Sequence, residues 1–65
     1  MQLIVNDQTI EAPERMSVTD FIQWFKQEGN FAIAVNMEFI PRSLYSETML
    51  KEDDRVEIVL PMQGG

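Results

Sequence analysis

The chain has 65 residues and a formal charge of −6, from eleven acidic and five basic side chains, so we expect one small domain. The acidic balance disfavours nucleic acid and anionic membranes as partners, because Lys and Arg supply the affinity for both. The absence of cysteine and histidine excludes disulfides and disfavours metal sites and triad chemistry. No apolar run reaches the roughly 20 residues of a membrane span, and residues 1–6 lack the basic start of a signal peptide, so we expect a cytoplasmic protein.

The first part of the chain has the pattern of a β-hairpin. Residues 2–6 are rich in strand-forming side chains, and residues 9–12 follow as a second strand that Pro13 ends. Between them, Asn6-Asp7-Gln8 predicts a turn, because Asn and Asp tolerate left-handed backbone and bond to nearby main chain. Alternation along the strands gives the expected inward residues, which are Met1, Leu3, Val5 and Ile10.

Residues 17–28 predict the main helix. Apolar side chains recur at helical spacing along one face, at Val18, Phe21, Ile22 and Phe25. Ser17 followed by Asp20 resembles a capping box, and Gly29 stands where a left-handed C-cap is expected. Trp24 lies off the centre of the apolar stripe, so we expect it to cover the edge of the core rather than form a binding platform.

The second half of the chain predicts three further strands. Residues 31–35 form the first, residues 39–40 begin a short one that Pro41 confines to an edge, and residues 56–60 form the last. Residues 43–49 are expected to be a loop or a short helical turn. The expected core residues of these segments are Ile33, Val35, Leu44, Tyr45, Leu50, Val56, Ile58 and Leu60.

The order of these elements predicts an α+β fold in which one helix covers one face of a sheet. If the first and last strands are parallel neighbours, the helix is their crossover, and the last strand lies centrally between the first and the third. We expect residues 1–60 to form this domain and residues 61–65 to form a flexible C-terminal tail. A central strand is the element least prone to fray, so it would give the tail a firm base.

The tail ends in Gly64-Gly65, which surround the terminal carboxylate with almost no side-chain bulk. Glycine lacks Cβ and accepts backbone conformations closed to other residues, so such a tail can be threaded into a narrow enzyme cleft. Just before it, Val59 is expected to face away from the helix, and residues 60–62 form an apolar run. Exposed apolar groups beside a functional tail favour a docking patch, whereas a buried Leu60 would be ordinary core.

A resemblance spans essentially the whole chain. The pieces that carry it are Asn6, Ser17-Val18, Ala34-Val35-Asn36, Ile40-Pro41-Arg42, residues 50–58 and Gly64-Gly65. With these pieces in their order and spacing, the chain resembles the ubiquitin-like sulfur carriers, and most of all the ThiS family of thiamine-biosynthesis sulfur carriers. The resemblance implies a β-grasp (ubiquitin-like) fold, a mixed sheet with one main helix packed across one face. Three positions depart from the family pattern: Met37 and Asp53 replace usual glycines, and Gln63 is more polar than expected.

The resemblance implies a carrier that is not itself an enzyme and that binds no cofactor or metal. An adenylyltransferase of the ubiquitin-activating type (ThiF-like) would use ATP to adenylate the Gly65 carboxylate. A sulfur donor system such as a cysteine desulfurase would then supply the sulfur of a C-terminal thiocarboxylate, and a thiazole synthase (ThiG-like) would accept it for thiazole formation. The implied partner-binding tail comprises Val59, Leu60, Pro61, Met62, Gln63 and Gly64, and the carrier alone is expected to be a monomer.

Two other functions fit the same features. A carrier of this fold could serve molybdopterin or another sulfur-containing metabolite, although those chains tend to be longer. A ubiquitin-like interaction module would have no sulfur chemistry and would stay active without Gly65. Outside the tail, the acidic run 52–54 could steer a basic partner or be a solvated turn. Arg42 could pair with an acidic partner or pack its stem on the surface.

Overall fold

The computed structural model describes residues 1–61 and contains five β-strands, one α-helix and one short 3₁₀-helix. In chain order these are β1 (Gln2–Val5), β2 (Gln8–Glu11), α1 (Val18–Phe25), β3 (Ala32–Val35), β4 (Glu38–Ile40), η1 (Arg42–Leu44) and β5 (Arg55–Val59). No helix in this part of the chain is long and apolar enough to cross a membrane.

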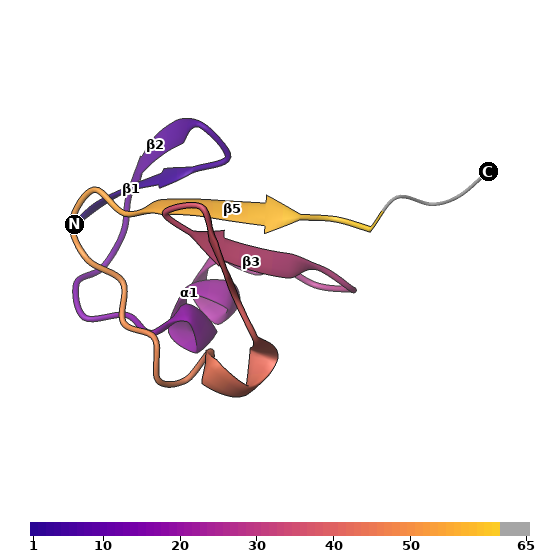
Figure 1. Cartoon of the computed structure of the whole chain (residues 1–65). Coiled ribbons are helices and arrows are strands. Elements are labelled where there is room, and N and C mark those ends of the chain that lie inside the picture. The colour runs from indigo at the N-terminus through magenta and orange to yellow at the C-terminus, as the bar shows by residue number, and fades with distance from the viewer. Residues whose placement is uncertain (62–65) are drawn as a thin grey trace.

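The strands form one mixed sheet in the order β2-β1-β5-β3-β4, with α1 lying across one face (Figure 1). β1 and β5 are parallel, whereas β2 pairs with β1, and β3 with both β4 and β5, in antiparallel fashion. The prediction that the last strand is central, between the first and the third, is therefore confirmed. β4 lies at the edge of the sheet, where Pro41 ends it as expected.

The hydrophobic core lies between α1 and the sheet. Its five largest fully buried side chains are Phe21, Leu3, Ile33, Val18 and Val56. Val5 is also buried, and four further expected inward residues of the strands are partly buried against this cluster, namely Met1, Ile10, Val35 and Ile58. Fully burying such a side chain is worth about 1.5–3 kcal/mol, so these few residues dominate the stability of a domain of this size.

The helix is shorter than its apolar pattern predicts. The capping box is confirmed: the N–H of Asp20 donates to Ser17 Oγ and the N–H of Ser17 donates to Asp20 Oδ2, both at 3.1 Å. At the other end, Lys26 and not Gly29 is the left-handed C-cap, with φ 60°. Its N–H bonds back to carbonyls of the last turn, so the helix stops at Phe25 and the last residue of the expected apolar stripe is 39% exposed.

Both β-hairpins turn through two residues with positive φ. Asn6 and Asp7 have φ of 46° and 68°, and Asn36 and Met37 have φ of 51° and 69°. Two-residue turns of this kind match the right-handed twist of the strands that they join. Met37 therefore adopts the left-handed backbone that a glycine would adopt without strain, and the turn type is the same in both hairpins.

The segment between β4 and β5 packs beside α1. The N–H of Val18 donates to the Thr48 carbonyl at 2.9 Å, and the N–H of Leu50 donates to the Met16 carbonyl at 2.8 Å. Tyr45 and Leu50 are buried as predicted, but Leu44 is 44% exposed, so its predicted burial is wrong. The carbonyl of Leu44 accepts bonds from the N–H groups of Glu47 and Thr48 and from the Thr48 hydroxyl, and these bonds close the turn after η1.

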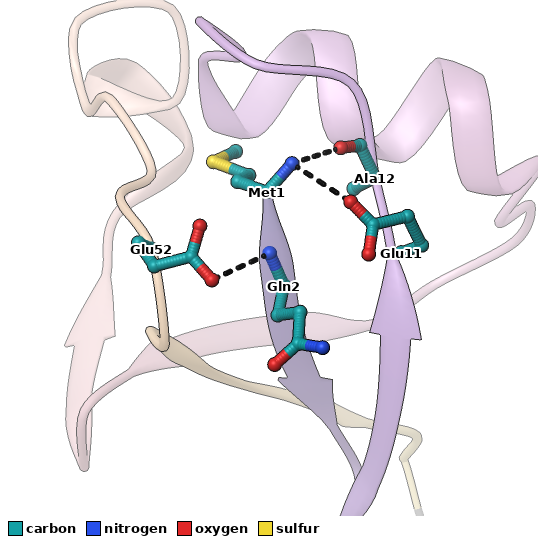
Figure 2. A network of polar contacts seen from close by, with 5 residues as sticks. All are labelled: Met1, Gln2, Glu11, Ala12 and Glu52. Carbon is teal, nitrogen blue, oxygen red and sulfur yellow. Dashed lines mark hydrogen bonds and ion pairs between the residues drawn. The ribbon is translucent and has the colours of Figure 1, made fainter.

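Figure 2 shows how the start of β1 is tied to its neighbours. The Met1 amino group lies 3.2 Å from Glu11 Oε2 and donates to the Ala12 carbonyl at 2.6 Å. The N–H of Gln2 donates to Glu52 Oε2 at 3.0 Å, which holds the segment before β5 against β1. This bond gives part of the acidic run 52–54 a role within the fold.

Candidate functional site

The base of the C-terminal tail is the end of β5. The strand ends at Val59, one residue earlier than expected, and residues 60–61 continue beyond the sheet (Figure 1). Val59 is 43% exposed and Leu60 is 60% exposed, so the prediction that Leu60 faces the core is wrong. The inward alternation of Val56 and Ile58 stops because Leu60 lies beyond the last paired residue. Leu60 and Pro61 are therefore available on the surface, which favours docking over the core alternative.

Two different neighbours hold the last residues of β5. On one side, β3 pairs through Ala32 with Val59. On the other side, the backbone pairing with β1 ends at Val5 and Val56. Beyond this point the Asn6 side chain, rather than the β1 backbone, bonds to β5. Its Oδ1 accepts from the N–H of Ile58 at 2.9 Å, and its Nδ2 donates to the Ile58 carbonyl at 3.5 Å.

The start of β5 is fixed by a buried polar group. Asp54 is 6% exposed, and its carboxylate accepts bonds from the N–H of Lys51 at 2.7 Å and from Asn36 Nδ2 at 3.0 Å. Asn36 Oδ1 in turn accepts from the N–H of Arg55 at 3.0 Å. Asp53 has φ 68°, which confirms that Asp accepts the left-handed backbone here. Asp54 is thus a buried structural residue rather than part of a solvated turn.

The face of the sheet opposite α1 carries exposed apolar side chains, and we call it the open face. In the strand register Glu57 pairs with Ala34, and Ala34 pairs with Phe39, so these three share the face turned away from the core. Phe39 is 67% exposed, and Val59 lies two residues beyond Glu57 on the same face. The open face therefore extends from Phe39 of β4 across β3 to Val59 at the tail base.

Sequence reasoning missed Phe39 as a candidate binding residue. The available signal was the alternation of β4, because Ile40 packs against the core and its neighbour must point the other way.

A hollow on the same face is lined by Ile4, Asp7, Met37, Arg55 and Glu57. Within it, Arg55 Nη1 lies 3.4 Å from Asp7 Oδ1, and both side chains are largely exposed.

The other predicted site residues fall into two groups. Arg42 is the first residue of η1 and is exposed. Met62, Gln63, Gly64 and Gly65 lie outside the residues that the structure describes. Within residues 1–61, no group of three or more His, Cys, Asp or Glu side chains has an arrangement that could hold a metal ion.

A mixed five-stranded sheet with one helix across it is the β-grasp fold of ubiquitin-like proteins, and here the central strand is followed by the exposed residues Leu60 and Pro61. A model of the ThiS family matches residues 1–65, so the chain belongs to the ThiS family. This family membership makes it a sulfur carrier protein of thiamine biosynthesis rather than an enzyme.

Individual relatives agree with this family. The sulfur carrier protein ThiS of Escherichia coli (strain K12) is 23% identical over 66 residues, which cover 100% of both chains. The crystal structure of the thiamine biosynthesis protein ThiS from Geobacter metallireducens is 29% identical, covers 100% of both chains and superposes with a TM-score of 0.85. A solution structure of a thiamine biosynthesis protein from the same organism gives a TM-score of 0.81, covering 100% of this chain and 88% of the other.

Proposed function

We propose that this sulfur carrier works through the carboxylate of Gly65. A partner adenylyltransferase of the ubiquitin-activating type (ThiF-like) uses ATP to form an acyl-adenylate there, with release of pyrophosphate. The outer sulfur of a persulfide on the donor system then displaces AMP and forms an acyl disulfide, and an external thiol reduces this disulfide to the thiocarboxylate. The sulfur of the thiocarboxylate passes to a thiazole synthase (ThiG-like). The observation that carries this proposal is the exit of the tail from a central strand, with Leu60 and Pro61 exposed just beyond the last paired residue.

The physical chemistry of the chain suits such a division of labour. A carboxylate is a poor electrophile until one of its oxygens becomes part of a good leaving group, and adenylation provides that. The residues that catalyse this step would belong to the partner, so a chain without His or Cys can still take part in acyl chemistry. Fully extended, five residues from 61 to 65 span at most about 17 Å, enough to enter a cleft while the domain stays outside.

The docking surface that we propose combines the tail base with the open face. The tail would bind as an extended peptide through main-chain hydrogen bonds, and Gly64 would allow close approach in a narrow channel. Phe39 and Val59 supply exposed apolar surface beside it, in agreement with the aromatic anchors that dominate protein interfaces.

The sulfur would come from a donor system such as a cysteine desulfurase, and the use of ATP by the partner supports a cytoplasmic location.

Intact mass tests this proposal. The chain is incubated with ATP, its cognate adenylating enzyme and a sulfur source, and we expect a mass gain equal to the exchange of one oxygen for sulfur, localised to Gly65. A chain that lacks Gly65 is the matched control and should keep its mass. An unchanged mass of the full chain, with a partner that demonstrably forms the acyl-adenylate of another carrier, would contradict the proposal. An interaction module without sulfur chemistry would bind equally well with and without Gly65.

A further inference from the structure

The backbone pairing of β5 with β1 stops before the end of β5. The N–H of Asn6 donates to the Val56 carbonyl at 3.0 Å, which is the last backbone bond between these segments. At Asn6 and Asp7 the chain turns away into the β1–β2 hairpin, with φ of 46° and 68°. Along a strand, every second residue directs its N–H and C=O toward the same neighbouring strand. Val56 directs these groups toward β1, so Ile58 is the next residue of β5 to do so.

The side chain of Asn6 takes the place of the missing strand. Its amide carries one acceptor and one donor group, like a peptide unit, and both contact the same residue of β5. Oδ1 accepts from the N–H of Ile58 at 2.9 Å and Nδ2 donates to the Ile58 carbonyl at 3.5 Å. With Val59 paired to Ala32 of β3, the last two residues of β5 are held from opposite sides.

We propose that Asn6 is a positioning residue for the C-terminal tail. By fixing the backbone of Ile58, it sets the direction in which Leu60 and Pro61 leave the sheet, and so the direction from which the terminal carboxylate enters a partner. The inference rests on the proposed function, because it concerns delivery of that carboxylate. Holding a reacting group near its productive geometry raises the rate of the step that follows docking, so Asn6 should act on kcat.

The fold contains a matched control for this role at the opposite end of β5. Asn36 also occupies the first position of a two-residue turn, with φ 51°, and its Oδ1 also accepts a bond from β5, at the N–H of Arg55. Its bond lies at the start of the strand, three residues before Ile58, and does not touch the tail base. A purely structural role predicts similar effects from the two asparagines, whereas a positioning role predicts an effect of Asn6 alone.

The test compares Asn6→Gly, Asn6→Asp and Asn36→Gly with the unaltered chain, under conditions in which each is folded. Glycine accepts the positive φ and removes only the side chain, and Asp keeps an oxygen that can accept from Ile58. Pyrophosphate release by the cognate adenylating enzyme with ATP gives kcat and KM. We expect Asn6→Gly to lower kcat about tenfold with KM changed less than about twofold, and Asn36→Gly to leave kcat within about twofold. Asn6→Asp should recover most of the loss.

Hydrogen exchange at the Ile58 amide should be faster in Asn6→Gly and unchanged in Asn36→Gly. Equal kcat for Asn6→Gly and the unaltered chain would overturn the inference while leaving the proposed function intact. An effect confined to KM would also overturn it, because Asn6 would then be a docking contact. No pyrophosphate release with the unaltered chain would overturn the proposed function and this inference with it. If Asn6→Gly does not fold, the comparison is repeated with Met37→Gly added to every chain, because glycine at this positive φ is expected to stabilise the domain.

Discussion

The side-chain amide of Asn36 donates a hydrogen bond of 3.0 Å to the buried carboxylate of Asp54, just before the central strand begins. The same carboxylate accepts the N–H of Lys51 at 2.7 Å. Replacing Asp54 with Ala would remove both bonds, and a hydrogen bond to a charged group contributes about 1.5–3 kcal/mol. We therefore expect Asp54→Ala to lower the free energy of unfolding by about 2 kcal/mol, measured by urea denaturation.

Asp54→Asn is the graded control, because an amide keeps one acceptor oxygen but offers a second donor where the carboxylate had an acceptor. Its loss of stability should lie between those of the Ala variant and the unaltered chain. A change in unfolding free energy below about 0.5 kcal/mol for Asp54→Ala, the range of ordinary surface substitutions, would show that the network contributes little.

Two stacked aromatic residues of α1 should differ sharply in their contribution to stability. The ring centroids of Phe21 and Phe25 lie 5.2 Å apart, but Phe21 is 0% exposed and Phe25 is 39% exposed. Phe21→Ala should cost about 3–5 kcal/mol, a large share of the roughly 3–10 kcal/mol expected for a domain of this length. Phe25→Ala should cost about 1 kcal/mol, because much of its surface already contacts water. Thermal unfolding followed by circular dichroism ranks the two, and equal losses would contradict this account of the core.

Met37 offers a site for stabilisation. Its φ of 69° is strained for a residue with a Cβ, and its side chain is 86% exposed, so little packing depends on it. Met37→Gly should raise the free energy of unfolding by about 0.5–1 kcal/mol, because relief of strain exceeds the added entropy of the unfolded chain. Met37→Ala keeps the strain and should change stability little. A Gly variant less stable than the Ala variant in urea titrations would show that this turn is not strained.

The sequence predicts the elements and their order well because those depend on local patterns. The hairpin of β1 and β2 follows from Asn6-Asp7, and the capping box follows from Ser17 and Asp20. The central place of β5 follows from a connection rule for parallel strands rather than from any one residue. These predictions are confirmed.

The errors and omissions arise where the residue types of a segment do not decide its structure. The helix is shorter than its apolar pattern predicts because Lys26 takes a left-handed backbone that its residue type does not favour. Leu60 continues the apolar alternation, yet the ladder with β3 ends at Val59 and leaves it exposed. The bond of Asn6 to Ile58 joins residues 52 positions apart, so it depends on the register of two strands and has no signal in either segment. Gly64 and Gly65 stay predictions as site residues, because they lie outside residues 1–61.

Phe39 provides the sharpest test of the open face as a docking surface. It is 67% exposed and its cross-strand partner is Ala34, so replacing it with Ser removes surface without opening the core. Aromatic residues at the centre of an interface commonly contribute more than 1 kcal/mol, so Phe39→Ser should weaken binding to the adenylating enzyme about tenfold, measured by calorimetric titration. Met49→Ser is the matched control, because Met49 is 51% exposed but bridges to Ser17 beside α1. Equal affinities of the two variants would show that the docking surface lies elsewhere. A loss of affinity for Phe39→Ser alone would show that β4 and the tail base belong to one contiguous interface.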